Sequence, residues 1–298
     1  MNFIKNRKKF FIISAIIILI GLLTMPFQAM NGNDILNYGI EFKGGTIIHL
    51  NIGMEYNIEE EIRPLVEEHL GDETARIQNV PGTNEVIITT KPTEQVQRKT
   101  FVDKIKEKYN IEGNPILVED FVSPTISPEI KAKAIEAVVL GAILMLIYIS
   151  IRFKDFKFGA SAVAGLIHDV LIMLAVYSIF RIPINNSFIA AMLTIIGYSI
   201  NDTIIVFDRI RENKGRMKGN DEEVINTSIN QTLSRSINTS LTTLVMVALL
   251  FIFGTSSVKE FAFPLLIGII SGTYSSIFIA SPIWFEMRKK HRSKSAKN

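Results

Sequence analysis

The sequence predicts an α-helical polytopic membrane protein with six transmembrane helices and one α+β domain between the first and second helices. The chain of 298 residues is 48% hydrophobic with a mean hydropathy of +0.28, which is too apolar for a soluble protein of ordinary charge. Its charge is also divided, because residues 30–128 carry 17 acidic and 9 basic side chains and the remainder carries 12 and 23. An acidic, water-exposed domain is therefore inserted into a basic, apolar chain.

Six apolar segments approach the ~20 residues that a membrane-spanning helix needs. They are 10–27, 134–151, 158–180, 182–207, 237–253 and 261–284. The segments divide the chain into four parts. These are an N-terminus with the first helix (1–29), an extracytoplasmic domain (30–130), helices two to six (131–287) and a basic tail (288–298).

The basic side chains indicate the orientation. They gather before the first helix, between helices two and three, between helices four and five, and after the sixth, whereas the opposite loops carry only Arg181 and Lys259. Positively charged loops stay in the cytoplasm, so we expect both termini on that side of the cell membrane. The basic surplus reflects this topology, and we expect no nucleic-acid partner. A cleaved signal peptide ending near Ala29 is the alternative for the first segment.

The acidic domain has the pattern of a ferredoxin-like fold. Strands are expected at 46–52, 76–80, 85–90 and 115–122, and amphipathic helices at 58–70 and 93–109. Their order is βαββαβ. Ser-Pro pairs at 123–124 and 127–128 predict a stiff link into the second membrane helix.

The residues that carry common enzyme chemistry are missing or scattered. The chain has no cysteine, and its four histidines lack metal-ligand spacing. The acidic domain has no phosphate-binding loop and no recognisable catalytic set of side chains. We therefore expect a binding or mechanical module, with no enzymatic activity, metal or cofactor.

The main candidate site lies in the fourth apolar segment, where Asn201 and Asp202 stand among isoleucines and valines. A carboxylate at that depth costs ~2.5–3.5 kcal/mol on insertion scales, and intramembrane acids commonly mark ion paths. Asp202 lies six residues before Asp208, which places it ~9 Å inside the cytoplasmic boundary. Burial disfavours the charged form of a carboxylate, so Asp202 is a candidate proton carrier. A hydrogen bond that only fixes helix packing is the alternative.

Other polar residues could assist Asp202. Arg235 begins the polar face of the fifth helix and can approach Asp202, unless its side chain extends to the interface. His168 and Asp169 lie mid-span in the third helix and form either part of the proton pathway or a satisfied interior pair. In the sixth helix, the small residues Gly268, Gly272 and Ser276 recur every four positions, which favours close helix packing over a substrate path.

The chain resembles the SecD/SecF family of protein export membrane proteins, within the RND transporter superfamily. The segment GYSINDTIIVFDRIREN (197–213) is similar to the family's fourth-helix signature, and LIHDVLI (166–172) to its third-helix motif. The start of the fifth helix (230–240) and most of the sixth (261–284) also match, and the last favours the SecF branch. YGIEFKGGT (38–46) resembles the family segment after the first helix, with Gly39, Glu41, Phe42, Gly44 and Gly45 in the motif and Glu41 where the family usually has Asp.

This resemblance implies function and partners. The family promotes protein export with the proton-motive force, and by resemblance Asp202 is the proton-carrying carboxylate and Arg235 the essential arginine. The implied coupling ion is a proton, with sodium as the alternative. The implied partners are SecD, the SecY/SecE/SecG channel, YidC and YajC, and unfolded preprotein.

Two other functions remain open at this point. One is a small-molecule or lipid exporter of the same superfamily, although such pumps usually carry twice as many helices and outer domains in one chain. The other is a proton-independent scaffold of the translocon, in which Asp202 only packs.

Overall fold

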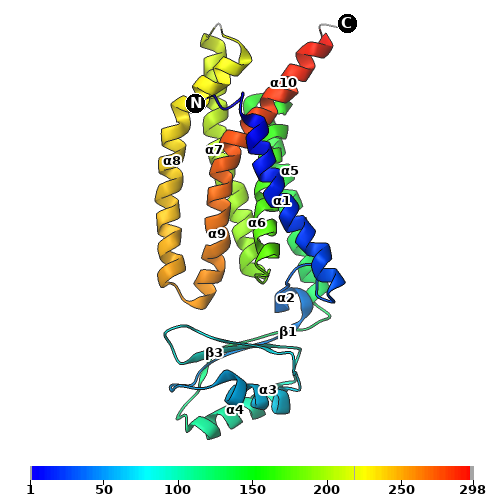
Figure 1. The fold of residues 1–298 in the computed structure, drawn as a ribbon, viewed down its shortest axis with the longest axis vertical. Coiled ribbons are helices and arrows are strands. Elements are labelled where there is room, and N and C mark those ends of the chain that lie inside the picture. The colour runs from blue at the N-terminus through cyan, green and yellow to red at the C-terminus, as the bar shows by residue number, and fades with distance from the viewer. Residues whose placement is uncertain (1, 218, 296–298) are drawn as a thin grey trace. The chain divides into compact units, whose positions relative to one another are not determined.

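A computed structural model describes residues 2–217 and 219–295 of the chain. It contains two compact units, shown in Figure 1, which are described separately below. One unit is the segment Tyr38–Ala134, and the other combines Met1–Asn37 with Ile135–Asn298. The sequence predicts these bounds at 30–130 for the outer domain and at 131–287 for helices two to six.

The smaller unit is the ferredoxin-like domain that the sequence predicts. Its described strands are β1 (Gly45–Asn51), β2 (Arg76–Asn79), β3 (Glu85–Thr90) and β4 (Ile116–Val122). They form one antiparallel sheet in the order β2-β3-β1-β4. Its helices are the short α2 (Ile40–Lys43), α3 (Arg63–Leu70) after a π-helical turn η1 (Ile58–Ile62), and α4 (Gln95–Tyr109). The fold class is thereby confirmed.

Local signals start and stop these helices. Asn57 accepts hydrogen bonds from the backbone N–H groups of Glu59 and Glu60 before η1, and Glu94 with Gln97 forms a capping box before α4. Alternate strand residues such as Ile48 and Ile88 are fully buried against Phe101 of α4. The period-two pattern of the strands therefore builds one apolar core on the helix-covered face.

The larger unit contains six helices, within the described residues, that are long and apolar enough to cross a membrane. They are α1 (Arg7–Met30), α5 (Ser127–Phe153), α6 (Phe156–Ile179), α7 (Asn186–Arg216), α8 (Asp221–Phe253) and a sixth span, Ser256–Lys289. The sixth is built from α9 (Ser256–Ser275), a π-helical turn η2 (Ser276–Ala280) and α10 (Ser281–Ser295). The predicted tail at 288–298 is helical to Ser295, and residues 296–298 lie outside the described part.

Two predicted boundaries are wrong. The fifth helix begins at Asp221 rather than in the segment 230–240, because Val224, Ile225 and Ile229 bury one face of the polar turns that precede that segment. The predicted stiff link ends earlier than expected, because Ser127 and Pro128 belong to the first turn of α5. Proline is tolerated in that turn, where its missing N–H is not needed.

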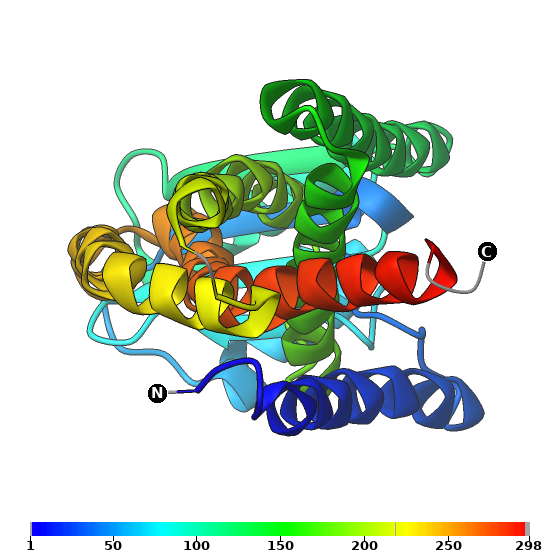
Figure 2. The ribbon, with the colours of Figure 1, turned by 90° about the horizontal axis from the view of Figure 1, so that it is seen from above.

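The core of the membrane unit is formed mainly by α6, α7 and the sixth span. Phe158, Phe207 and Trp284 stack near one end, with ring centroids 4.7–4.9 Å apart. Seen from above (Figure 2), α1 and α5 lie on opposite sides of α6, and α8 lies on the flank. The flanking helices leave much of their apolar surface exposed within this chain.

Candidate functional site

Asp202 lies inside the helix bundle, on the face of α7 that meets α8 and α9. Only 2% of the residue is exposed. Its Oδ2 accepts a hydrogen bond from Ser240 of α8 at 3.1 Å, and Thr273 of α9 donates to the same Ser240 hydroxyl at 2.6 Å. Its Oδ1 has no hydrogen-bond partner among the residues that the structure describes. Asp202 is therefore a buried acid with one unused acceptor.

Asn201 and Arg235, two other candidate residues of the proton pathway, are both more exposed than Asp202. Asn201 is exposed on the outer side of α7. Arg235 is exposed on α8, one turn and more before Ser240. It is close enough to interact electrostatically with Asp202, but no ion pair joins the two within the described residues. Arg235 can therefore influence the charge on Asp202 without being fixed to it.

His168 and Asp169 form a second buried polar cluster, which we call the Asp169 cluster. Asp169 is 1% exposed, and its carboxylate accepts four hydrogen bonds. Oδ1 accepts from Ser271 at 2.7 Å and from His168 Nδ1 at 3.1 Å, and Oδ2 accepts from Ser199 at 2.7 Å and from Ser275 at 2.8 Å. These donors come from α6, α7 and α9.

The histidine extends this cluster to the first helix. The Nε2 atom of His168 lies 2.9 Å from the hydroxyl of Ser14 in α1. The ring of Tyr274 stacks on the imidazole, with centroids 5.8 Å apart. The structure therefore places His168 and Asp169 together. On α9, Ser271 and Ser275 face Asp169, whereas Thr273 between them faces Ser240, the donor to Asp202.

The small residues Gly268, Gly272 and Ser276 lie where the sixth span meets α7. A Cβ atom on Gly268 would lie 2.4 Å from Ile195, and one on Gly272 would lie 2.9 Å from Ser199. Ser276 is fully buried, and its hydroxyl lies 2.8 Å from that of Thr203. Close approach of the two helices leaves no room for a larger side chain at Gly268 or Gly272.

The glycine motif after the first helix forms a tight turn in the smaller unit. Gly39 is the N-cap of α2, which contains Glu41 and the buried Phe42. Gly44 has φ +79° and Gly45 has φ +156°, conformations that side chains rarely adopt. A Cβ on Gly44 would also lie 2.8 Å from Pro124. The backbone conformation and the close neighbours therefore explain why glycine is needed at positions 44 and 45.

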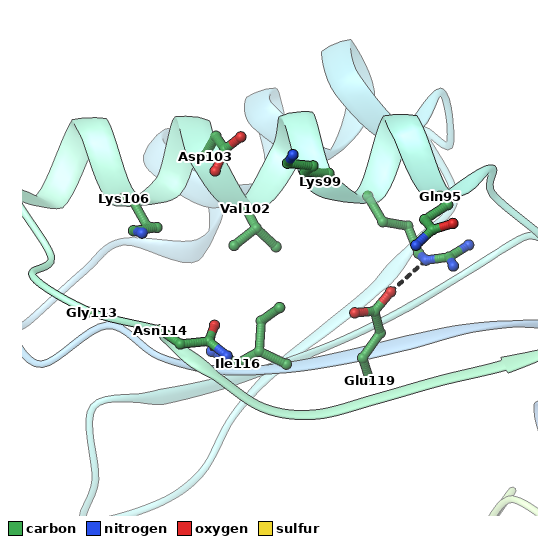
Figure 3. A pocket seen from close by; sticks show the side chains of 10 residues that line it. Gln95, Lys99, Val102, Asp103, Lys106, Gly113, Asn114, Ile116 and Glu119 are labelled. Atoms are coloured by element: carbon green, nitrogen blue, oxygen red, sulfur yellow. Dashed lines mark hydrogen bonds and ion pairs between the residues drawn. The ribbon is translucent and has the colours of Figure 1, made fainter.

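A groove in the smaller unit is the other candidate site. It lies between α4 and β4, holds about 480 Å³, and is lined by Lys99, Val102 and Lys106 on the helix and by Ile116 on the strand (Figure 3). An ion pair between Arg98 and Glu119, at 2.6 Å, lies at one end. No acid–base pair with a nucleophile lines it, and the described residues contain no cluster suited to a metal ion.

Sequence reasoning missed the hydroxyl groups that surround the two acids. Ser199, Ser240, Ser271, Thr273 and Ser275 all donate to Asp169, to Asp202 or to a neighbour of one of them. The signal was present in the run SGTYSS (271–276), which is unusually rich in hydroxyls for a membrane helix. Alternate positions in that run face different acids.

Comparisons with known proteins agree on one family. Residues 85–290 match the family model described as "Protein export membrane protein SecD/SecF, C-terminal". The chain is 38% identical to protein translocase subunit SecF of Petrotoga mobilis, over 98% of this chain and 97% of that protein. It is 36% identical to SecF of Vibrio alginolyticus, over 98% of this chain and 91% of that protein.

Solved structures give the same result. The crystal structure of SecDF from Thermus thermophilus, a translocon-associated membrane protein, matches with a TM-score of 0.82 at 34% identity. The match covers 97% of this chain but only 39% of the SecDF chain. SecDF in its super-membrane-facing form matches with a TM-score of 0.69 at 33% identity, over 100% of this chain and 40% of that one.

Proposed function

Because this chain belongs to the SecD/SecF family of protein export membrane proteins, as a multi-pass SecF-type translocase subunit, we propose that it promotes protein export with the proton-motive force. The observation that carries this proposal is the environment of Asp202. It is buried between three helices, one of its oxygens has no partner among the described residues, and an arginine lies within electrostatic range. A buried acid that is incompletely hydrogen-bonded can exchange a proton at small structural cost.

The proposed cycle starts with an ionised Asp202. In that state the carboxylate accepts the hydrogen bond from Ser240, and Arg235 on the same helix as Ser240 carries the opposite charge. Protonation gives Asp202 an O–H donor and removes its negative charge. The attraction of Asp202 to Ser240 and its attraction to Arg235 then weaken together. Both partners belong to α8. Each proton that enters and leaves therefore loosens and restores the contact between α7 and α8.

The partners follow from the family. SecD is the proposed partner, because this chain matches 39% of the SecDF chain and leaves the rest of that chain unmatched. The SecY/SecE/SecG channel, YidC and YajC, and an unfolded preprotein complete the proposed assembly. With both termini in the cytoplasm, the ferredoxin-like domain stands on the side where the preprotein emerges.

The test is preprotein translocation into inverted membrane vesicles that contain this chain and SecD. Asp202→Asn is compared with the wild type and with Asp208→Asn, a matched control on the same helix whose carboxylate is half-exposed and paired with Arg152 and Arg211. An imposed proton gradient should accelerate translocation in the wild type and the control but not in Asp202→Asn. Equal acceleration in all three would favour the scaffold function.

The ion is tested in the same vesicles. A sodium gradient imposed without a proton gradient should have no effect on the wild type. Acceleration by sodium alone would make sodium the coupling ion, since a carboxylate binds either.

A further inference from the structure

Hydrogen bonds to Asp169 and His168 join four helices, which are α1, α6, α7 and α9. Asp169 of α6 receives donors from Ser199 of α7 and from Ser271 and Ser275 of α9. His168 carries the connection to Ser14 of α1. Each carboxylate oxygen already accepts two hydrogen bonds, so a proton on Asp169 would force a buried hydroxyl to turn from donor to acceptor. Such a cluster resists rearrangement.

The helix α8 is held differently along its length. Its first half is anchored, since Val224, Ile225, Ile229 and Ser236 are buried. Beyond Ser240, every residue of 241–253 is described and Val247 alone is buried. Ser240 is therefore the last buried polar contact before a half-helix whose side chains mostly face outward within this chain.

The far end of α8 also leaves space beside its neighbours. A cavity of about 280 Å³ is lined by Phe251 of α8, Phe263 of α9 and Tyr177 of α6. The rings of Phe251 and Phe263 are in contact at its wall, with centroids 5.5 Å apart. This pocket is open to the surface, so it leaves room for that half of the helix to shift.

We infer that Asp169 is a positioning residue that fixes α1, α6, α7 and α9 as one unit, and that the half of α8 beyond Ser240 moves against this unit. The inference rests on the proposed function, because protonation of Asp202 supplies the reason for movement. The chain Asp202–Ser240–Thr273 is the contact that opens, since it joins α8 to both α7 and α9. The Asp169 cluster holds α7 and α9 in place while this contact opens.

Two pairs of hydroxyl residues allow a matched test in a chain that has no natural cysteine. The oxygens of Ser240 and Thr273 are 2.6 Å apart and span the proposed moving boundary. Those of Thr203 and Ser276 are 2.8 Å apart and lie inside the proposed fixed unit. Each pair is replaced by cysteines, S240C/T273C or T203C/S276C, and oxidised to a disulfide.

The vesicle assay then gives opposite expectations. Oxidised S240C/T273C should lose its response to the proton gradient and recover it with a reducing agent. Oxidised T203C/S276C should respond as its reduced form does. Loss of response in both oxidised variants, or in neither, would overturn the inference. If Asp202→Asn keeps its response, the proposed function itself fails; if only the cysteine result fails, the proposed function stands.

A second measurement does not depend on activity, because replacing Ser240 also removes a hydrogen-bond donor to Asp202. The yield of each disulfide is measured with and without an imposed proton gradient. The gradient should lower the yield for S240C/T273C severalfold and leave that for T203C/S276C unchanged. Equal yields for S240C/T273C under both conditions would contradict movement of α8.

The positioning role of Asp169 has its own test. Asp169→Asn should reduce the response to the gradient severalfold without moving the pH at which that response is half-maximal. The T203C/S276C disulfide should restore part of the response, because it ties α7 to the sixth span covalently. A shifted pH midpoint would make Asp169 a proton carrier, and no rescue would contradict the positioning role.

Discussion

Asp169 and Asp202 are the same residue type, are both almost fully buried and lie on neighbouring helices, yet their surroundings differ. Asp169 accepts four hydrogen bonds from three helices, whereas Asp202 accepts one and keeps an oxygen without a partner in the described structure. Burial is therefore alike at the two acids and the number of hydrogen bonds differs. In our proposal, this difference separates an acid that holds helices together from one that exchanges a proton.

Replacing each acid with leucine should separate the two most strongly. Asp169→Leu leaves several buried donors unpaired and should cost ~3–5 kcal/mol of stability. Asp202→Leu removes a poorly compensated acid and should change stability by about 1 kcal/mol or less. Thermal unfolding can be followed through Trp284, the single tryptophan, which is buried in the membrane unit. Equal losses in the two variants would contradict the comparison.

The close approach of α9 to α7 should matter next, because Ser199 of α7 and Ser271 of α9 both donate to Asp169 and must keep their places. Gly268→Ala puts a Cβ 2.4 Å from Ile195 and should cost ~1–3 kcal/mol by overpacking. Gly197→Ala is the matched control, since nothing lies within 4 Å of its added Cβ. The same Trp284 melting experiment checks both variants, and equal melting temperatures would argue against tight packing.

Asp72 extends the comparison to a buried acid of the ferredoxin-like domain. Burial raises the pKa of its carboxyl, but hydrogen bonds from Lys91, Thr74 and Thr90 outweigh this effect and lower the pKa to about 2. The folded pKa lies below the ordinary value of 3.8, so this stabilisation is present above pH ~4 and is lost as the pH falls toward 2.

Asp72→Asn should therefore destabilise the domain by ~1–3 kcal/mol at neutral pH and make little difference near pH 2. Hydrogen exchange of the β3 amides in the full chain measures this effect. Protection that falls equally in wild type and variant between pH 4 and pH 2 would contradict it.

The smallest expected effect is that of Ser14→Ala. It removes one hydroxyl beside His168 at the edge of the Asp169 cluster and should cost ~0.5–1.5 kcal/mol. Trp284 unfolding is again the measurement. A loss as large as that of Asp169→Leu would place the centre of the cluster at the histidine instead.

Much of this arrangement could be predicted from the sequence. Hydropathy located the six spans, and alternation located the strands, because each reflects burial of one face along the chain. The start of α8 was missed because its first turns bury isolated residues such as Ile225 in an otherwise polar segment. The different roles proposed for Asp169 and Asp202 rest on donors such as Ser275 and Ser240, which come from helices distant in sequence, so no local pattern could separate the two acids.

The central claim is that Asp202, and not Asp169, changes its protonation state. Infrared difference spectroscopy of the reconstituted protein, with pH steps across the neutral range, detects the carboxyl stretch that appears when a buried acid gains a proton. The account predicts a band that is lost in Asp202→Asn and kept in Asp169→Asn. A band that survives in Asp202→Asn and disappears in Asp169→Asn would contradict it.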